Sequence, residues 1–147
     1  MLLRMHVFTK GKIVFSAMAI AAVSVVGTAH ANEVNLVINN ATSATLYLVS
    51  GSPYGKFPST IQPGQKYQIN PALQFGGSRS DIEVVYERRD TGSACRFTAS
   101  HIERPTLGPF FDKSADSVGA GYASCQALQS PSWQPPYNYS AEFAYYY

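Results

Sequence analysis

The sequence has 147 residues, of which 46% are hydrophobic and 14% are charged. This length fits one domain with one modest core. The formal net charge is only +2, and beyond residue 31 no basic cluster is denser than Arg88 and Arg89, so a nucleic-acid partner is not expected.

The first 31 residues have the parts of a signal peptide. Basic residues precede an apolar run of 14 residues (13–26), and Ala29-His30-Ala31 is a small-x-small cleavage site. A membrane anchor is the alternative, but a spanning helix needs about 20 apolar residues. We therefore expect residues 1–31 to be removed and residues 32–147 to form one exported domain, secreted or periplasmic, without a transmembrane segment.

The cysteines fit an exported chain. Cys95 and Cys125 are the only two, and an even pair in an oxidising compartment predicts a disulfide. The bond would close a loop of about 31 residues, which the chain-entropy model values at roughly 3 to 4 kcal/mol. His101 is the one histidine beyond residue 31, too few ligands for a zinc site, so no metal or cofactor is expected.

The first strands follow from a hydrophobic period of two. Residues 34–39 and 45–49 alternate, and the Asn- and Ser-containing segment 39–43 between them predicts a hairpin turn. A loop rich in Gly, Ser and Pro (50–58) follows. The Pro63-Gly64 turn then leads into a strand over 66–69.

The clearest alternation covers 81–87, with Gly92 in the turn that returns the chain into an antiparallel strand at 95–100. The segment 102–120 is interrupted by Pro and Gly and is expected to be a long loop. Strands are expected at 122–128 and 142–147. About seven or eight short strands in all predict a single antiparallel β-sandwich.

No catalytic constellation is visible. His101 has no Gly-x-Ser-x-Gly elbow or other nucleophile motif beside it, and no Gly-rich phosphate loop or calcium loop is present. The sequence therefore predicts a protein that is not an enzyme.

Aromatic residues are the best functional hint, because 17 of residues 32–147 are Phe, Tyr or Trp. Tyr and Trp combine an apolar body with a polar tip, which suits a lipid, a glycan or a protein partner. The same rings would also serve to complete a small core. The candidate binding residues lie in predicted loops: Tyr54, Lys56, Phe57, Trp133, Tyr137 and Tyr139.

A structural subunit of a surface assembly is the alternative function. The closing alternation of Phe143, Tyr145 and Tyr147 would suit a pilin-like strand that pairs with a partner chain. The sequence does not determine the oligomeric state. It also contains two glycosylation sequons, at Asn40 and Asn138.

The stretch from Val34 to Ile69, with Gly55-Lys56-Phe57 and Ile61-Gln62-Pro63-Gly64, resembles the first half of aegerolysin-type proteins. The segment 76–86, followed by a turn and Cys95, continues in a similar order, so the likeness covers about 60 residues. The resemblance implies a small β-sandwich that binds membrane lipid, with a contact face that includes Lys56, Phe57 and the region of Trp133.

Overall fold

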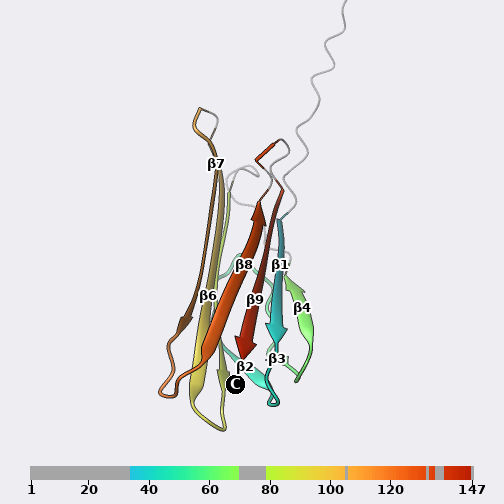
Figure 1. The fold of residues 1–147 in the computed structure, drawn as a ribbon, viewed down its shortest axis with the longest axis vertical. Coiled ribbons are helices and arrows are strands. Elements are labelled where there is room, and N and C mark those ends of the chain that lie inside the picture. The colour runs from blue at the N-terminus through green and yellow to red at the C-terminus, as the bar shows by residue number, and fades with distance from the viewer. Residues whose placement is uncertain (1–33, 70–78, 105, 132, 135–137, 147) are drawn as a thin grey trace, which may run out of the picture.

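The computed structural model describes residues 34–69, 79–104, 106–131, 133–134 and 138–146. The expected signal peptide and its cleavage site lie outside this part of the chain. The described residues form nine strands and no helix, which confirms the all-β prediction. Figure 1 shows the longer strands running along the long axis of the molecule.

The strands form two sheets. The first has four strands, in the order β4 (Lys66–Ile69), β1 (Val34–Asn40), β9 (Tyr139–Tyr146), β8 (Ser124–Pro131). The second has five strands, in the order β3 (Thr60–Ile61), β2 (Leu46–Gly51), β5 (Arg79–Arg88), β6 (Ser93–Arg104), β7 (Gly108–Ser117).

The two sheets bury one common core. Each long strand turns alternate apolar side chains toward the other sheet, and Phe97 of β6 meets Phe143 of β9 with ring centroids 5.2 Å apart. Burial of such side chains contributes about 25 cal/mol per Å² of apolar surface. The period-two pattern of the sequence is thus satisfied by cross-sheet packing.

Several local predictions are confirmed. The strand at 66–69 has the expected bounds, and the Pro63-Gly64 turn places Gly64 at φ 72°. The hairpin of β5 and β6 forms around Gly92, whose φ is 64°. These positive φ values favour glycine because it has no Cβ.

The predicted first hairpin is wrong. β1 pairs with β4 and β9, whereas β2 pairs with β3 and β5, so the connection between them crosses from one sheet to the other. The buried Asn40 side chain holds this crossing: its Nδ2 donates to the carbonyl oxygens of Ala44 (2.8 Å) and Ile61 (2.9 Å). Its Oδ1 accepts from the backbone N–H and the hydroxyl of Thr42.

The same bonds bear on the first sequon. Asn40 is fully buried and its Nδ2 is used by two carbonyl groups, so the folded chain offers no amide nitrogen there for a glycan. The predicted turn over residues 39–43 is present, with Asn40 bonded to Thr42. Only the sheet to which the turn leads differs from the expectation.

The expected long loop at 102–120 is also wrong, because most of it is strand. β6 continues to Arg104, and β7 pairs with it antiparallel from Gly108 to Ser117. Gly108 adopts a φ of 79° at the turn, and Pro109 is the second residue of β7, an edge strand, which is a place where sheets tolerate proline.

The sequence predicted a purely antiparallel arrangement, and this prediction is wrong for one pair of strands. β9 lies between β1 and β8, parallel to β1 and antiparallel to β8. Within the described residues, no helix has the length and apolar character that a membrane crossing requires.

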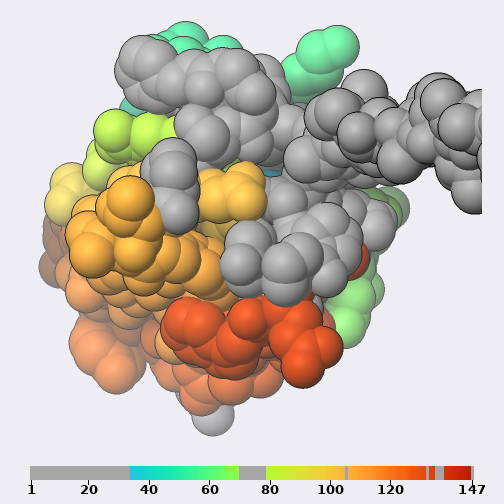
Figure 2. Space-filling model, turned by 90° about the horizontal axis from the view of Figure 1, so that it is seen from above, coloured from blue at the N-terminus to red at the C-terminus, as the bar shows by residue number. Residues whose placement is uncertain are grey.

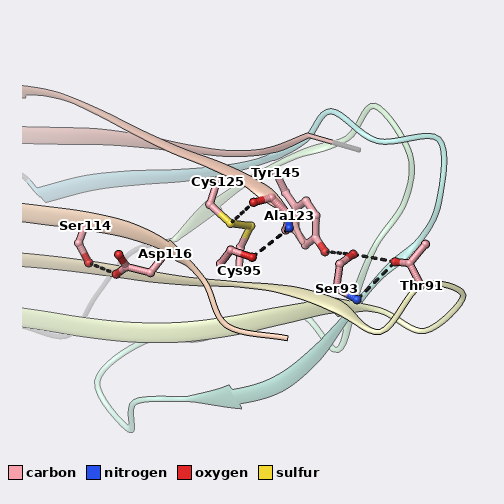
Figure 3. Close-up of a disulfide and its surroundings, with 9 residues drawn as sticks. Thr91, Ser93, Cys95, Ser114, Asp116, Ala123, Cys125 and Tyr145 are labelled. Atoms are coloured by element: carbon pink, nitrogen blue, oxygen red, sulfur yellow. Dashed lines mark hydrogen bonds between the residues drawn. A yellow bond between two sulfur atoms is a disulfide. The ribbon is translucent and has the colours of Figure 1, made fainter. Parts of the chain in front are cut away.

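The predicted disulfide is confirmed. Cys95 of β6 and Cys125 of β8 join the two sheets, with their Cα atoms 5.8 Å apart. Figure 3 shows the bond beside a chain of hydroxyl groups, in which the buried Ser93 contacts both Tyr145 (2.8 Å) and the exposed Thr91 (2.7 Å). A covalent bond and a polar network therefore fix the same end of the molecule.

Reduction of this disulfide should lower the free energy of unfolding by about 3 kcal/mol, because the unfolded chain regains the entropy of the open loop. Urea denaturation with and without reductant measures the change. The double variant Cys95→Ala/Cys125→Ala is the control, and reductant should not alter its midpoint. An unchanged midpoint in the unaltered protein would contradict the prediction.

Asn40→Ala should destabilise the protein by about 2 kcal/mol, because two carbonyl groups would lose their donor. Thr45→Ala is the matched control, since the Thr45 hydroxyl bonds only an exposed Gln62 side chain. Its effect should stay within about 0.5 kcal/mol. Equal losses in the two variants, measured by thermal or urea unfolding, would show that the Asn40 bonds do not hold the crossing.

Candidate binding surface

The first group of candidate residues lies in the connection between β2 and β3. Tyr54 is 44% exposed and Lys56 is exposed, but Phe57 is half-buried and packs against the core. A Cβ on Gly51 would come within 2.6 Å of the Phe57 Cδ2, so this glycine leaves room for the ring. Phe57 therefore supports the loop, and Tyr54 and Lys56 are the groups that face solvent.

Trp133 follows β8 and is 67% exposed. Its ring rests edge-on against Phe111 of β7, with centroids 5.1 Å apart and an angle of 84° between the planes. This T-shaped geometry is favourable for aromatic pairs. Trp133 is therefore held in place on one side while most of its surface is open to solvent.

Tyr139 was expected in a loop and instead begins β9, with its ring buried. Its hydroxyl donates to the backbone oxygen of Asp112 (2.9 Å). Burial, together with the nearby Asp112 charge, raises the pKa of Tyr139 to about 12, so the phenol is neutral. Tyr139 thus serves the core, and Tyr137 lies outside the described residues.

The structure does not bring the two groups of candidates together. The connection that carries Tyr54 leaves β2, whereas Trp133 contacts β7, and β5 and β6 lie between these strands. Three strand spacings correspond to roughly 14 Å across the sheet. Lys56 and Phe57 therefore do not lie next to Trp133, and the three residues do not form one continuous contact face.

Two exposed apolar residues near Trp133 were missed by the sequence analysis. Leu107 is 76% exposed in the turn between β6 and β7, and Phe110 is 44% exposed at the start of β7. Pro105 and Gly108, on either side of Leu107, are typical turn residues. The sequence analysis predicts a long loop there rather than a tight turn between two strands.

We call the exposed residues Leu107, Phe110 and Trp133 the hairpin-end patch; Phe110 lies on the outer face of β7 and Trp133 on the inner side, against Phe111, so the members share one end of the molecule rather than one face. Its members belong to the turn of β6 and β7 and to the connection after β8, which lie at the same end of the molecule (Figure 1). Figure 2 looks down on this end, with the hairpin in orange and the start of β9 in red-orange. The Arg104 guanidinium lies over the Phe110 ring at 5.6 Å, which adds a cation to the patch.

An aromatic stack lies beneath the patch. Phe111, which supports Trp133, also stacks on His101 (5.2 Å) and on Tyr139 (5.2 Å). His101 is fully buried, and burial lowers its pKa below the usual range. The patch therefore rests on rings contributed by β6, β7 and β9.

The opposite end has an open depression of about 310 Å³, lined by Ala44, Thr45, Tyr47, Arg89 and Asp90. The Arg89 guanidinium covers the Tyr47 ring at 3.9 Å. Arg88 holds the Asp90 carboxylate with two hydrogen bonds, and this pairing lowers the pKa of Asp90. Both charged residues that line the depression therefore already have partners, Arg89 in Tyr47 and Asp90 in Arg88.

No group of three His, Cys, Asp or Glu side chains within the described part of the chain is placed to hold a metal ion. The strand proposed for pairing with a partner chain, β9, has both of its edges occupied, by β1 and β8. Tyr147, the last residue of that expected strand, is not among the described residues.

No protein-family model matches this chain, and no curated protein matches it either.

Trp133→Ala should cost no more than about 1 kcal/mol of stability, because it removes one edge contact from an exposed ring. Phe111→Ala should cost about 3 kcal/mol or more, because it empties a buried site shared by three other rings. Chemical denaturation followed by circular dichroism measures both. A large loss for Trp133→Ala would mean that Trp133 belongs to the core.

Proposed function

We propose that the chain is an exported, non-catalytic binding module, folded as a β-sandwich, whose hairpin-end patch contacts the surface of a lipid membrane. The observation that carries this proposal is the exposure of Trp133 (67%) and Leu107 (76%) at the same end of the molecule. Large apolar side chains exposed together at one end of a small domain are the kind of surface that an apolar partner would cover.

The chemistry of the patch favours lipid over the other ligand classes. Leu107 and Phe110 have no hydrogen-bonding side-chain group, whereas a glycan site needs donors and acceptors around its aromatic rings. Trp is suited to the headgroup region, since its indole has an apolar body and one polar N–H. Arg104 beside Phe110 supplies a positive charge for lipid phosphate.

Two further observations support the proposal. The Cys95–Cys125 disulfide is typical of proteins in oxidising compartments, which agrees with the expected export signal. The resemblance to aegerolysin-type proteins implies lipid binding, although the exposed apolar side chains lie mainly at the hairpin end rather than around Lys56 and Phe57.

The proposal is tested by titrating the purified protein with phosphatidylcholine vesicles, with and without 20% phosphatidylserine, while recording Trp133 fluorescence. Trp133 is the one tryptophan of the sequence, so a blue shift reports directly on the patch. Leu107→Ser should weaken binding about tenfold, because burying a leucine side chain contributes about 1.5 kcal/mol or more.

Tyr122→Ser is the matched control, because Tyr122 is 84% exposed but follows the bridge of Gly121 to Ser93 at the opposite end. This variant should bind vesicles like the unaltered protein. Binding to a glycan array or to a protein, with no shift on either vesicle, would assign the patch to another ligand class and refute the membrane proposal.

A further inference from the structure

His101 is a buried ionisable group without a hydrogen-bond partner. Its ring is fully buried, and among the described residues neither Nδ1 nor Nε2 has a hydrogen-bond partner. The ring lies beside Phe111 (5.2 Å, 19°) and Tyr139 (6.1 Å, 17°), and the centroids of these two rings are themselves 5.2 Å apart, so the three rings form a triangular cluster. A neutral imidazole tolerates this apolar site, whereas a protonated one would leave a buried charge unsolvated.

Few charged groups face His101. On β6, Glu103 is the next inward position and is half-buried; on β7, Lys113 shares the inner side with Phe111. The register partner on β5 is the uncharged Ser80, and β9 contributes the neutral phenol of Tyr139. β1 and β8 contain no Asp, Glu, Lys, Arg or His.

The surroundings therefore favour the neutral ring. Burial lowers the pKa of His101, and the Glu103 charge opposes this only in part. Arg79, Asp81, Arg104 and Asp112 occur nearby in the sequence of β5, β6 and β7, but their positions alternate with the inward ones.

His101 is connected to the hairpin-end patch through one ring. Phe111 stacks on His101 and also makes the T-shaped contact with Trp133. A change that separates His101 from Phe111 would therefore also release Trp133.

We propose that protonation of His101 opens this stack, frees Phe111 and Trp133 to turn outward, and so strengthens membrane binding in acid. This regulation rests on the proposed membrane contact. Opening adds the apolar surface of Phe111 to the patch, which gives a physical reason for tighter binding.

The direction of the pH dependence follows from linkage. An open state, with a solvated imidazole, takes up its proton near the ordinary pKa of about 6.5, whereas the closed stack takes it up at lower pH. Above pH 6.5 the equilibrium constant that favours the closed state over the open state does not change with pH. Below pH 6.5 this equilibrium constant falls by up to about tenfold per pH unit, until the pH reaches the lowered pKa of His101 in the closed state.

The first test uses no lipid. Hydrogen exchange of the purified protein at pH 7.5 and 5.0, corrected for intrinsic rates, should show protection in 108–113 and 139–141 falling at least tenfold in acid. His101→Phe keeps an aromatic ring without an ionisable group, and its protection should not change with pH. Glu103→Gln removes a charge that favours protonation in the closed stack, so the closed-state pKa of His101 should fall further and the loss of protection at pH 5.0 should be at least as large as in the unaltered protein.

Loss of protection in acid that persists in His101→Phe would overturn the proposal, and so would unchanged protection in the unaltered protein. If His101→Phe fails to fold, the ring-proton resonances of His101 in the unaltered protein provide the second measurement. A titration at or above pH 6.5 would show that the stack does not disfavour the charged ring, and would equally overturn the proposal.

The vesicle titration, repeated at both pH values, separates this inference from the proposed function. Binding at least tenfold tighter at pH 5.0, and pH-independent in His101→Phe, supports both. Equal binding at the two pH values with unchanged protection refutes the switch and leaves membrane contact standing. Changed protection without vesicle binding at either pH refutes membrane contact and leaves the opening of the stack standing.

Discussion

Burial of alternate side chains between the two sheets is the constraint on which the rest of the structure depends. Phe97 meets Phe143 across the interface, and Cys95 is bonded to Cys125 close to it. Any polar group in this space must find a partner or carry a cost. The buried tyrosines meet the requirement, because Tyr86, Tyr139 and Tyr145 bond to the Pro58 oxygen, the Asp112 oxygen and the Ser93 hydroxyl, respectively. His101 does not meet it: within the described residues, neither ring nitrogen has a hydrogen-bond partner.

The two ends of the molecule differ in how firmly they are held. The end of β1 and β9 has the Asn40 bonds. It also has the Tyr145–Ser93 contact and the disulfide, which Figure 3 shows. The other end has the hairpin-end patch, supported by aromatic stacking and by the Tyr139 hydrogen bond. A domain built this way can rearrange its exposed end while the cross-linked end keeps the two sheets together.

The candidate site could be found only in part from residue types. Trp133 was identified as an exposed aromatic residue because a Pro-rich segment surrounds it. Tyr139 looked similar in sequence, yet it begins a central strand whose neighbours cover its ring. Leu107 was passed over, because an aliphatic residue in an irregular stretch carries no signal until the strands on both sides of it are known to pair.

The sequence by itself determined the all-β class, the positive-φ turns at Gly64 and Gly92, and the pairing of the only two cysteines. These features follow from local alternation, local backbone preference and simple counting. Only the tertiary structure decided that β1 and β2 belong to different sheets, that β9 runs parallel to β1, and that Trp133 and Leu107 share one end. The physical reason is that alternation shows which face of a strand is apolar but not which strand lies beside it. That choice depends on side-chain bonds such as those of Asn40 and on packing between residues distant in the chain.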